Sequence, residues 1–428
     1  MCNIQKKANR SMSFREVLPE RVAIALKRYQ NEAVEFAVGT GGKVYLSFAM
    51  GLGKTLTSLA ISYIYRQEWP LLIFAPISIH FQWKNEIIFW FYPCITESNI
   101  VFLNRSYVPQ ERQEIFIASY DSVHLIPTDR NFAVVIVDEA HLIANSKTKR
   151  FSKIESFLKS ASRLVMCSGT PLSTNAFKGL VNQYKFLSDN GYVNQPSCNQ
   201  PIPDKMLIKH KCEDEKLPPK LRSPLYVRHA NIIPCVAPFQ ADAMSFVNFE
   251  IKCSEWKMQS FMQQYQSWLD SLPKTIIFYK HNVIKNMFIE KYGEESLILD
   301  GSVPPASRGV ILTNYFHNKN KRFLVLQLQV GNVGLNLQNV NHMCFLELDW
   351  SPSVLCQAED RIYRHGQTKI SNIYYVLSSC PNHIDMSFFL PNLNKKIVFL
   401  KEYGFYEHNQ IEFPATYHTK IVKAKSSE

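Results

Sequence analysis

The stretch VYLSFAMGLGKT, residues 44–55, joins an apolar run to two glycines, a lysine and a threonine. Gly51 and Gly53 let the backbone turn sharply, so that its N–H groups can face an anion before a helix begins near Thr55. The ammonium group of Lys54 can then reach the β- and γ-phosphates of ATP, and the hydroxyl of Thr55 can hold Mg²⁺. The sequence matches the short GxGKT form of the phosphate-binding loop. The alternative is a glycine-rich turn that only caps a helix.

A second chemical motif lies downstream, where VVIVDEAH occupies residues 134–141. Four apolar residues predict a buried strand, and two carboxylates follow at its carboxyl end. Asp138 can bind Mg²⁺ through water, and Glu139 can orient and deprotonate an attacking water. A polar strand end that only caps a helix is the alternative. The glycine-rich loop upstream favours the catalytic interpretation.

Apolar runs continue on both sides of these motifs and alternate with amphipathic stretches, which is typical of α/β proteins with parallel sheets. Two separate series of such runs predict two lobes. The predicted strands cover residues 44–48, 71–75, 115–119, 134–137 and 163–167, and then 275–279, 296–299, 322–328, 342–348 and 372–377. We expect an N-terminal ATP-binding lobe at 1–190, an inter-lobe insertion at 191–270, a C-terminal lobe at 271–400, and an extension with a basic tail at 401–428.

The overall charge favours a polyanionic partner. The 428 residues carry 48 Lys and Arg against 36 Asp and Glu, a formal net charge of +12, and such a surplus releases counterions when it neutralises phosphates. The ten cysteines form no CxxC pair, which argues against a zinc knuckle or a disulfide framework and indicates a reducing compartment. The N-terminus lacks the apolar core of a secretory signal, and no apolar run is long enough to span a bilayer. We therefore expect an intracellular protein, in the nucleus or the cytoplasm, that is not secreted.

The second predicted lobe carries QAEDRIYRHGQ at residues 357–367. Arg361 and Arg364 are three residues apart, so a helix would place both on one face. Guanidinium groups supplied from across a cleft would stabilise the charge on a departing γ-phosphate, and hydrolysis would then require the cleft to close. The alternative is an exposed helix end that carries charges of both signs.

In their order and strand context, these motifs resemble those of superfamily 2 helicases, and within that superfamily those of the Swi/Snf-like ATPases. LKRYQ at residues 26–30 is similar to the family's adenine-recognising motif, with Gln30 as the base reader. APIS at 75–78 and WKNE at 83–86 resemble the motif that begins the nucleic-acid track. Within it, we expect Trp83 to pack in the core.

The resemblance extends to residues that the family uses for coupling and for nucleic acid. SGTP, at residues 168–171, resembles the element that couples hydrolysis to movement, and His141 would bridge it to the nucleotide. GNVGLNL, at 331–337, matches a loop that lies near both nucleotide and DNA. For the lysines after DEAH, a solvated patch is the alternative to a DNA-phosphate contact. The resemblance implies a role in coupling or in binding nucleic acid for Ser119, Lys147, Lys149, Ser168, Gly169, Thr170 and Asn336. It implies contacts with the nucleotide for Gly334 and Gln357.

The resemblance implies two RecA-like lobes with ATP and Mg²⁺ in the cleft between them. It also implies a DNA-dependent ATPase that acts as a double-stranded-DNA translocase, a monomeric motor that contacts double-stranded or branched DNA. The QAEDR wording is closest to the annealing-helicase branch, which rewinds or remodels branched DNA, and compact motors of this kind also occur in large DNA viruses. Two alternatives stay open: a strand-separating DNA or RNA helicase, and an ATP-gated nucleic-acid clamp with little turnover.

Overall fold

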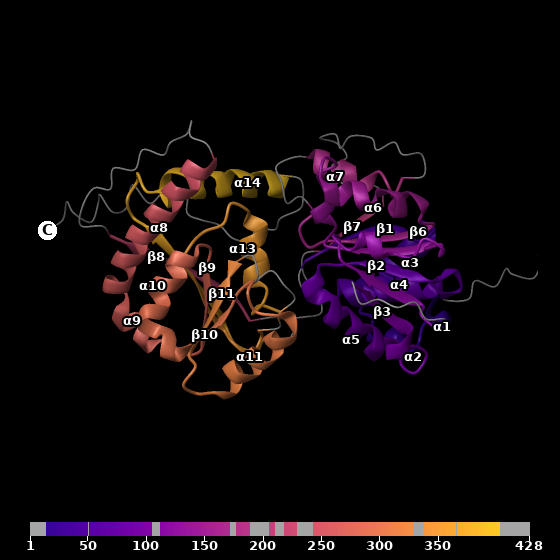
Figure 1. Cartoon of the computed structure of the whole chain (residues 1–428), viewed down its shortest axis with the longest axis horizontal. Coiled ribbons are helices and arrows are strands. Elements are labelled where there is room, and N and C mark those ends of the chain that lie inside the picture. The colour runs from indigo at the N-terminus through magenta and orange to yellow at the C-terminus, as the bar shows by residue number, and fades with distance from the viewer. Residues whose placement is uncertain are drawn as a thin grey trace, which may run out of the picture. The chain divides into compact units, whose positions relative to one another are not determined.

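The computed structural model describes residues 14–49, 51–104, 112–171, 177–188, 205–209, 218–228, 243–328, 335, 337–364 and 366–402. The chain divides into two compact units, Met1–Cys212 and Glu213–Glu428. Each unit is built on its own sheet (Figure 1). We call them the first lobe and the second lobe and describe each by itself.

The first lobe contains a seven-stranded sheet in the order β3-β4-β2-β5-β6-β1-β7, and every pairing in it is parallel. Every residue of the neighbouring strands β2, β4 and β5 is buried, as expected for parallel strands that are covered on both faces. The strands are β1 (Lys43–Phe48), β2 (Leu71–Phe74), β3 (Ile100–Leu103), β4 (Ile115–Ala118), β5 (Val134–Asp138), β6 (Arg163–Cys167) and β7 (Met206–Lys209).

The longer helices of the first lobe bury apolar side chains. In α6, Phe151, Ile154 and Leu158 are buried, and spacings of three and four residues put them on one side. The side chain of Thr148 caps that helix by accepting a hydrogen bond from the Phe151 N–H at 3.2 Å. The helices are α1 (Phe14–Val17), α2 (Glu20–Ala25), α3 (Arg28–Gly39), α4 (Lys54–Ile64), α5 (His80–Phe91), α6 (Lys149–Ser160) and α7 (Phe177–Tyr184).

The second lobe contains a six-stranded parallel sheet in the order β10-β11-β9-β12-β13-β8. Its strands are β8 (Lys220–Val227), β9 (Thr275–Tyr279), β10 (Ser296–Leu299), β11 (Phe323–Gln327), β12 (His342–Phe345) and β13 (Ser371–Ser378). Its helices are α8 (Ala243–Gln264), α9 (Gln266–Ser271), α10 (Asn282–Tyr292), α11 (Pro305–His317), α13 (Pro352–Glu359) and α14 (Leu390–Glu402). Within the described ranges, no helix of either lobe combines the length and the apolar character needed to cross a membrane.

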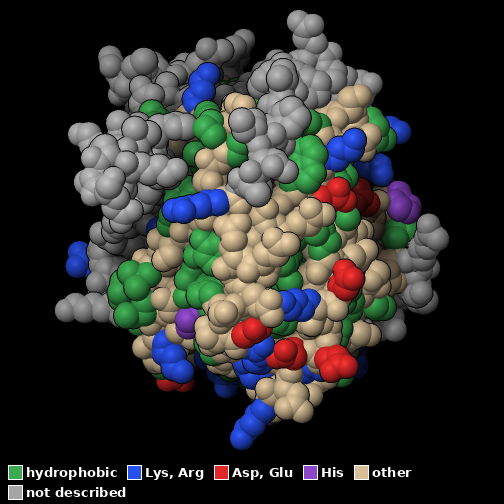
Figure 2. Space-filling model, turned by 90° about the vertical axis from the view of Figure 1, so that its left-hand side faces the viewer, with side chains coloured by type: hydrophobic (Ala, Val, Ile, Leu, Met, Phe, Trp, Pro, Cys, Tyr) green, Lys and Arg blue, Asp and Glu red, His purple; other side chains and the backbone are tan. Residues whose placement is uncertain are grey.

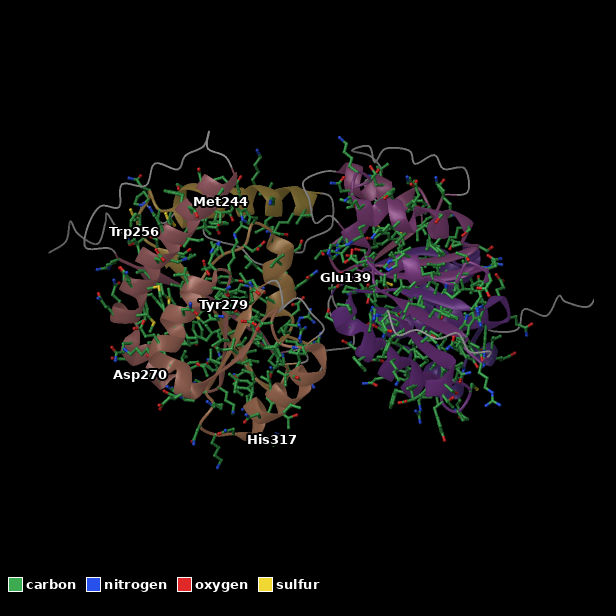
Figure 3. All side chains as sticks on the ribbon, in the orientation of Figure 1. Glu139, Met244, Trp256, Asp270, Tyr279 and His317 are labelled. Atoms are coloured by element: carbon green, nitrogen blue, oxygen red, sulfur yellow. The ribbon has the colours of Figure 1, made fainter. Side chains whose placement is uncertain are left out.

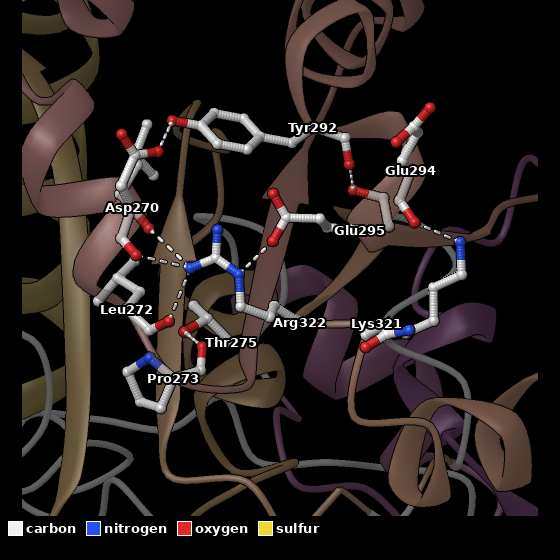
Figure 4. Close-up of polar contacts among 12 residues, drawn as sticks. Asp270, Leu272, Pro273, Thr275, Tyr292, Glu294, Glu295, Lys321 and Arg322 are labelled. Atoms are coloured by element: carbon white, nitrogen blue, oxygen red, sulfur yellow. Dashed lines mark hydrogen bonds and ion pairs between the residues drawn. The ribbon is translucent and has the colours of Figure 1, made fainter.

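Arg322 ties three segments of the second lobe together at the start of β11 (Figure 4). Its guanidinium group donates to the backbone carbonyls of Asp270 at 2.9 Å and Leu272 at 3.1 Å, and it also pairs with Glu295. The hydroxyl of Tyr292 donates to the Asp270 carboxylate at 2.8 Å. The end of α9 is thereby fixed to the strands that follow it.

The predicted α/β fold with two parallel-stranded lobes is confirmed, but three strands were missed. β3, β7 and β8 are absent from the predicted series, and the last two lie inside the segment 191–270 that the sequence assigned to an insertion. Both are edge strands, and β8 is mostly half-exposed. β8 lacks the continuous apolar run that identifies a central strand, so its sequence KLRSPLYV gave no strand signal, whereas the missed edge strand β3 does carry such a run, IVFL. In the structure, therefore, this segment contributes one strand to each sheet.

Candidate active site

The glycine-rich turn between β1 and α4 has the geometry of a phosphate cradle. Gly51 and Gly53 have φ angles of 80° and 71°, in the left-handed region that disfavours any residue with a Cβ atom. Gly53 directly precedes α4, so the unpaired N–H groups of the first helical turn are available to an anion there. The ammonium group of Lys54 donates to the carbonyls of Phe48 at 2.9 Å and Ala49 at 3.3 Å, so it lies against the same turn.

Gln30, the predicted adenine reader, contacts this turn directly. Its amide nitrogen lies 3.3 Å from the Leu52 carbonyl and 3.4 Å from the Gly53 carbonyl. Its amide oxygen accepts a hydrogen bond from the Lys27 N–H at 2.9 Å. The Tyr29 hydroxyl adds a further bond to the Leu52 carbonyl at 3.0 Å. The start of α3 and the glycine-rich turn therefore form one hydrogen-bonded unit.

The two carboxylates of DEAH lie at the carboxyl end of β5, where open α/β sheets bind ligands; Glu139 is labelled in Figure 3. One oxygen of Asp138 accepts from the Glu139 N–H at 2.9 Å, and the other accepts from the indole N–H of Trp83, also at 2.9 Å. The backbone carbonyl of Asp138 accepts from the Tyr120 hydroxyl. Glu139 itself has a φ of 53°, a strained conformation that occurs mainly at functional sites.

The donor set at this point fits a Mg²⁺ ion that is shared with a nucleotide. Burial, and then the neighbouring Glu139 carboxylate, raise the pKa of Asp138 from 3.8 to about 6. A cation would offset that cost by favouring the carboxylate form. Thr55 offers a hydroxyl and Asp138 a carboxylate, and Mg²⁺ is held by such oxygens together with waters and substrate phosphates. The described residues contain no group of three or more His, Cys, Asp or Glu that could hold a metal ion by itself.

A short chain of contacts leads from Glu139 to the predicted coupling segment. A ring nitrogen of His141 lies 3.2 Å from the Glu139 carboxylate and 3.0 Å from the Ser168 hydroxyl oxygen. The same hydroxyl oxygen accepts from the Thr170 N–H at 3.0 Å. The His141 side chain therefore links the segment of Ser168, Gly169 and Thr170 to the carboxylate expected to activate water.

The structure corrects one expectation about the arginines of the second lobe. The helix α13 ends at Glu359, so Arg361 and Arg364 lie beyond it, in a tight loop, and do not share a helical face. Arg361 is only 2 % exposed, whereas Arg364 is half-buried. Gly366, with a φ of 92°, belongs to this loop, whose sharp turns are incompatible with a continued helix. We call residues 360–367 the arginine loop; His365 lies outside the described residues.

Both ends of the arginine loop are anchored. At its start, Glu359 is fully buried and accepts two hydrogen bonds from Arg222 of β8, at 2.7 and 2.6 Å. Lys220 lies 3.2 Å from Glu359 and 2.6 Å from Asp360, and the Tyr375 hydroxyl donates to Glu359 at 2.8 Å. The anchor therefore consists of two cations and two carboxylates.

The other end of the arginine loop is held by a single amide group and not by charged side chains. The Gln367 side chain donates to the carbonyls of Gln338 at 2.9 Å, Val340 at 3.1 Å and Ile362 at 3.1 Å. The arginine loop is thus held by side chains from several parts of the second lobe.

The remaining predicted residues are less closely tied to the nucleotide cradle. The Ser119 hydroxyl bonds to Ser122 at 2.9 Å within a local turn. Lys147 and Lys149 are exposed, as either a phosphate contact or a solvated patch would require. Gln357 is buried on α13. Gly334 and Asn336 lie outside the described residues.

Sequence reasoning missed part of the role of Trp83 and all of the role of β8. Trp83 is buried, as expected for core packing, but it also donates to the carboxylate of Asp138. Arg222 and Lys220 lie in a segment with no recognisable period. A buried indole needs a hydrogen-bond acceptor, so the sequence offered a weak signal for Trp83 and none for the two cations.

Comparison with known families agrees with these two lobes. A family model for the SNF2-related domain matches residues 29–230, and one for the helicase conserved C-terminal domain matches residues 256–366. The chain therefore contains an SNF2-related domain and a helicase conserved C-terminal domain. Its two domains place it among the superfamily 2 ATPase/helicase-like enzymes.

Several curated SNF2-related proteins are similar to this chain. The SWI/SNF-related matrix-associated actin-dependent regulator of chromatin subfamily A-like protein 1 of Xenopus tropicalis is 27% identical, over 92% of this chain and 48% of its own length. The DNA annealing helicase and endonuclease of Mus musculus is 26% identical, over 85% of this chain and 40% of its own length. The chain thus spans about half the length of these relatives, or less. A solved structure, the Sulfolobus solfataricus SWI2/SNF2 ATPase core in complex with dsDNA, is 20% identical with a TM-score of 0.41 and covers 89% of this chain and 93% of that chain.

Proposed function

We propose that this chain is a DNA-dependent ATPase that moves along double-stranded DNA and remodels DNA or protein–DNA complexes. The observation that carries the proposal is the contact chain from Glu139 through His141 to Ser168. It joins the residue expected to activate water to the segment that would transmit movement. The names of the curated relatives, an annealing helicase and a regulator of chromatin, favour rewinding of DNA as the finer activity. They also favour a site of action in the nucleus.

In this proposal each residue of the first lobe has a defined role. Lys54 neutralises the β- and γ-phosphates, and Gln30 reads the adenine edge. Thr55 and Asp138 hold Mg²⁺, which would offset the charge of the phosphate oxygens. Glu139 accepts the proton of the attacking water, whose oxygen forms the new bond to the γ-phosphorus as the bond to the β-phosphate oxygen breaks.

The second lobe contributes the arginine loop. Arg361 and Arg364 would stabilise the negative charge that develops on the transferred phosphoryl group. Because these arginines and the phosphate cradle belong to different lobes, hydrolysis would depend on how the lobes are arranged, and DNA could control that arrangement. Contacts of Lys147 and Lys149 with DNA phosphates would make the binding salt-sensitive and largely independent of sequence.

Steady-state ATP hydrolysis tests the proposal directly. It is measured with no nucleic acid and then with duplex DNA, single-stranded DNA and RNA, beside the Glu139→Gln protein. We expect strong stimulation by duplex DNA that the variant loses. Annealing of a partly melted DNA fork, measured in the same preparations, tests the rewinding activity.

Other outcomes would favour the other functions. Stimulation by RNA or single strands alone would indicate a strand-separating helicase. ATP-dependent DNA binding without stimulated turnover would indicate a nucleic-acid clamp. Stimulation by duplex DNA with no annealing would keep the translocase and remove the rewinding activity.

A further inference from the structure

Trp83 makes a contact that core packing does not explain. It lies on α5, is 2 % exposed, and directs its indole N–H to an oxygen of Asp138 at 2.9 Å. A hydrogen bond to a charged acceptor is roughly twice as strong as one between neutral groups. The same carboxylate accepts on its other oxygen from the Glu139 N–H. Each oxygen is therefore held by one donor and keeps a further lone pair for a metal or a water ligand.

The contact fixes the orientation of a side chain that would otherwise rotate. Asp138 ends β5, and its backbone is positioned by the sheet and by the Tyr120 hydroxyl on its carbonyl. Those contacts leave the χ angles of the side chain undetermined. The Glu139 N–H and the indole together leave the carboxylate one orientation, because the two donors approach opposite oxygens.

The indole also belongs to a different functional segment from the carboxylate. α5 begins at His80, shortly after residues 75–78, and contains residues 83–86; we expect both stretches at the start of the nucleic-acid track. The side chain of Ile77 in this segment is 66% exposed, and that of Phe81 in the first turn of α5 is 55% exposed. One hydrogen bond therefore joins a helix that starts at an exposed surface to a carboxylate in the nucleotide site.

We propose that Trp83 is a positioning residue for the magnesium ligand Asp138, through which α5 sets the affinity of the nucleotide site for Mg²⁺. The inference rests on the proposed function, because it takes Asp138 as a ligand of the Mg²⁺ bound with ATP. Partners that orient metal ligands from outside the coordination shell typically change metal affinity about 10–100-fold when they are removed.

Trp83→Phe tests this with little change in packing, since it removes the N–H and retains an aromatic ring. Binding of a fluorescent, non-hydrolysable ATP analogue is titrated in EDTA and then at increasing Mg²⁺. We expect the affinity in EDTA to match that of the wild-type protein. The Mg²⁺ concentration for half-maximal enhancement should rise about tenfold, the lower end of the range for such partners. A structural role alone would change neither value.

The same helix provides a matched control. The indole N–H of Trp90 donates to the Glu86 carboxylate at 2.7 Å, so Trp90→Phe removes the same type of bond from a pair outside the nucleotide site. This variant should keep the wild-type Mg²⁺ dependence. If Trp83→Phe does not fold, incorporation of 3-benzothienylalanine at position 83 removes the N–H while keeping the ring volume.

Each result decides one question. A wild-type Mg²⁺ dependence in the folded position-83 variant overturns the role of Trp83 and leaves the proposed ATPase intact. Equal shifts in the position-83 and Trp90→Phe proteins overturn it as well, because the effect would then come from α5 as a whole. If the wild-type protein binds no nucleotide with or without Mg²⁺, the proposed function fails first.

Discussion

Gly53 shows most clearly how a single residue serves the candidate site. Its φ of 71° is one that residues with a Cβ atom disfavour, and an added Cβ would lie 2.3 Å from the Gln30 amide nitrogen. That amide is already engaged with the turn and with Lys27. A side chain at this position would therefore meet an unfavourable backbone conformation and would displace the Gln30 amide.

Gly53→Ala should weaken ATP binding and lower the free energy of unfolding by about 1–2 kcal/mol, the cost of a left-handed conformation for a non-glycine residue. It should also reduce the preference for ATP over GTP, because Gln30 must move. Gly39→Ala is the control, since a Cβ there meets nothing within 4 Å. Calorimetric titration with ATP and with GTP measures the two binding effects, and urea unfolding measures the change in stability. Equal behaviour of the two variants would contradict the assigned role of Gly53.

The two arginines of the arginine loop should respond differently to replacement. We expect Arg361→Ala and Arg364→Ala each to lower DNA-stimulated kcat by about 10³-fold, the lower end of the range for arginine fingers. Only Arg361 is almost fully buried, so only Arg361→Ala should also lower the free energy of unfolding, by about 2–3 kcal/mol. Urea unfolding beside steady-state kinetics separates the two. Similar losses of stability in both variants would show that burial does not distinguish these arginines.

Among the elements, the edge strand β8 has a role beyond completing a sheet. It pairs with β13 along its whole length and presents Arg222 and Lys220 to the carboxylates at the end of α13. Burial alone would raise the pKa of Glu359, but Lys220 and Arg222 outweigh it and lower that pKa. The strand thereby fixes the element that precedes the arginine loop.

Glu359→Gln should destabilise the second lobe by roughly 3–5 kcal/mol, because it removes the buried negative charge that pairs with Arg222 and, together with Asp360, with Lys220. The control is Glu32→Gln, which removes an exposed ion pair with Arg28 of 3.1 Å and should change stability little. Urea unfolding of both variants gives the comparison. A loss in Glu359→Gln no larger than in the control would mean that the cluster contributes no net stability.

At the scale of the whole molecule, the distribution of charge bears on the binding of DNA. The face shown in Figure 2 carries no patch of a single charge sign. That face belongs to the second lobe, and basic, acidic and apolar side chains are interspersed on it. The described residues on this face therefore form no basic patch.

The second lobe should make the protein sensitive to acid. Burial would raise the pKa values of three buried carboxylates, Glu347, Glu359 and Asp385, but their partners outweigh it and lower all three pKa values. The partner of Glu347 is His281, those of Glu359 are Lys220 and Arg222, and those of Asp385 are Lys257 and His383. A lowered pKa contributes stability that is complete above the unfolded values of 4.5 and 3.8 and is lost as pH falls through the folded ones.

The free energy of unfolding should therefore change little from pH 7 to about 5 through these groups and fall below about 4.5. Urea titrations at fixed pH values measure this. The slope should be shallower in Glu359→Gln, which lacks one of the three groups. If the free energy of unfolding is constant between pH 5 and 3.5, these buried ion pairs do not make the protein sensitive to acid.

The sequence by itself determined the α/β class and the central strands, and it located the two motifs that are predicted to bind ATP. These features are local: a buried parallel strand is a continuous apolar run, and GLGKT and DEAH each place their chemistry within a few residues. For the same reason the sequence could not define β8, whose residues KLRSPLYV form no such run.

Only the tertiary structure decided which distant side chains support these motifs. Trp83 and Asp138 are 55 residues apart, and Arg222 and Glu359 are 137 apart, so no local pattern connects either pair. The burial of Arg361 and the end of α13 before it also depend on packing within the second lobe. Local periodicity predicts which element a residue belongs to. Which distant side chain meets it depends on how the chain folds back on itself.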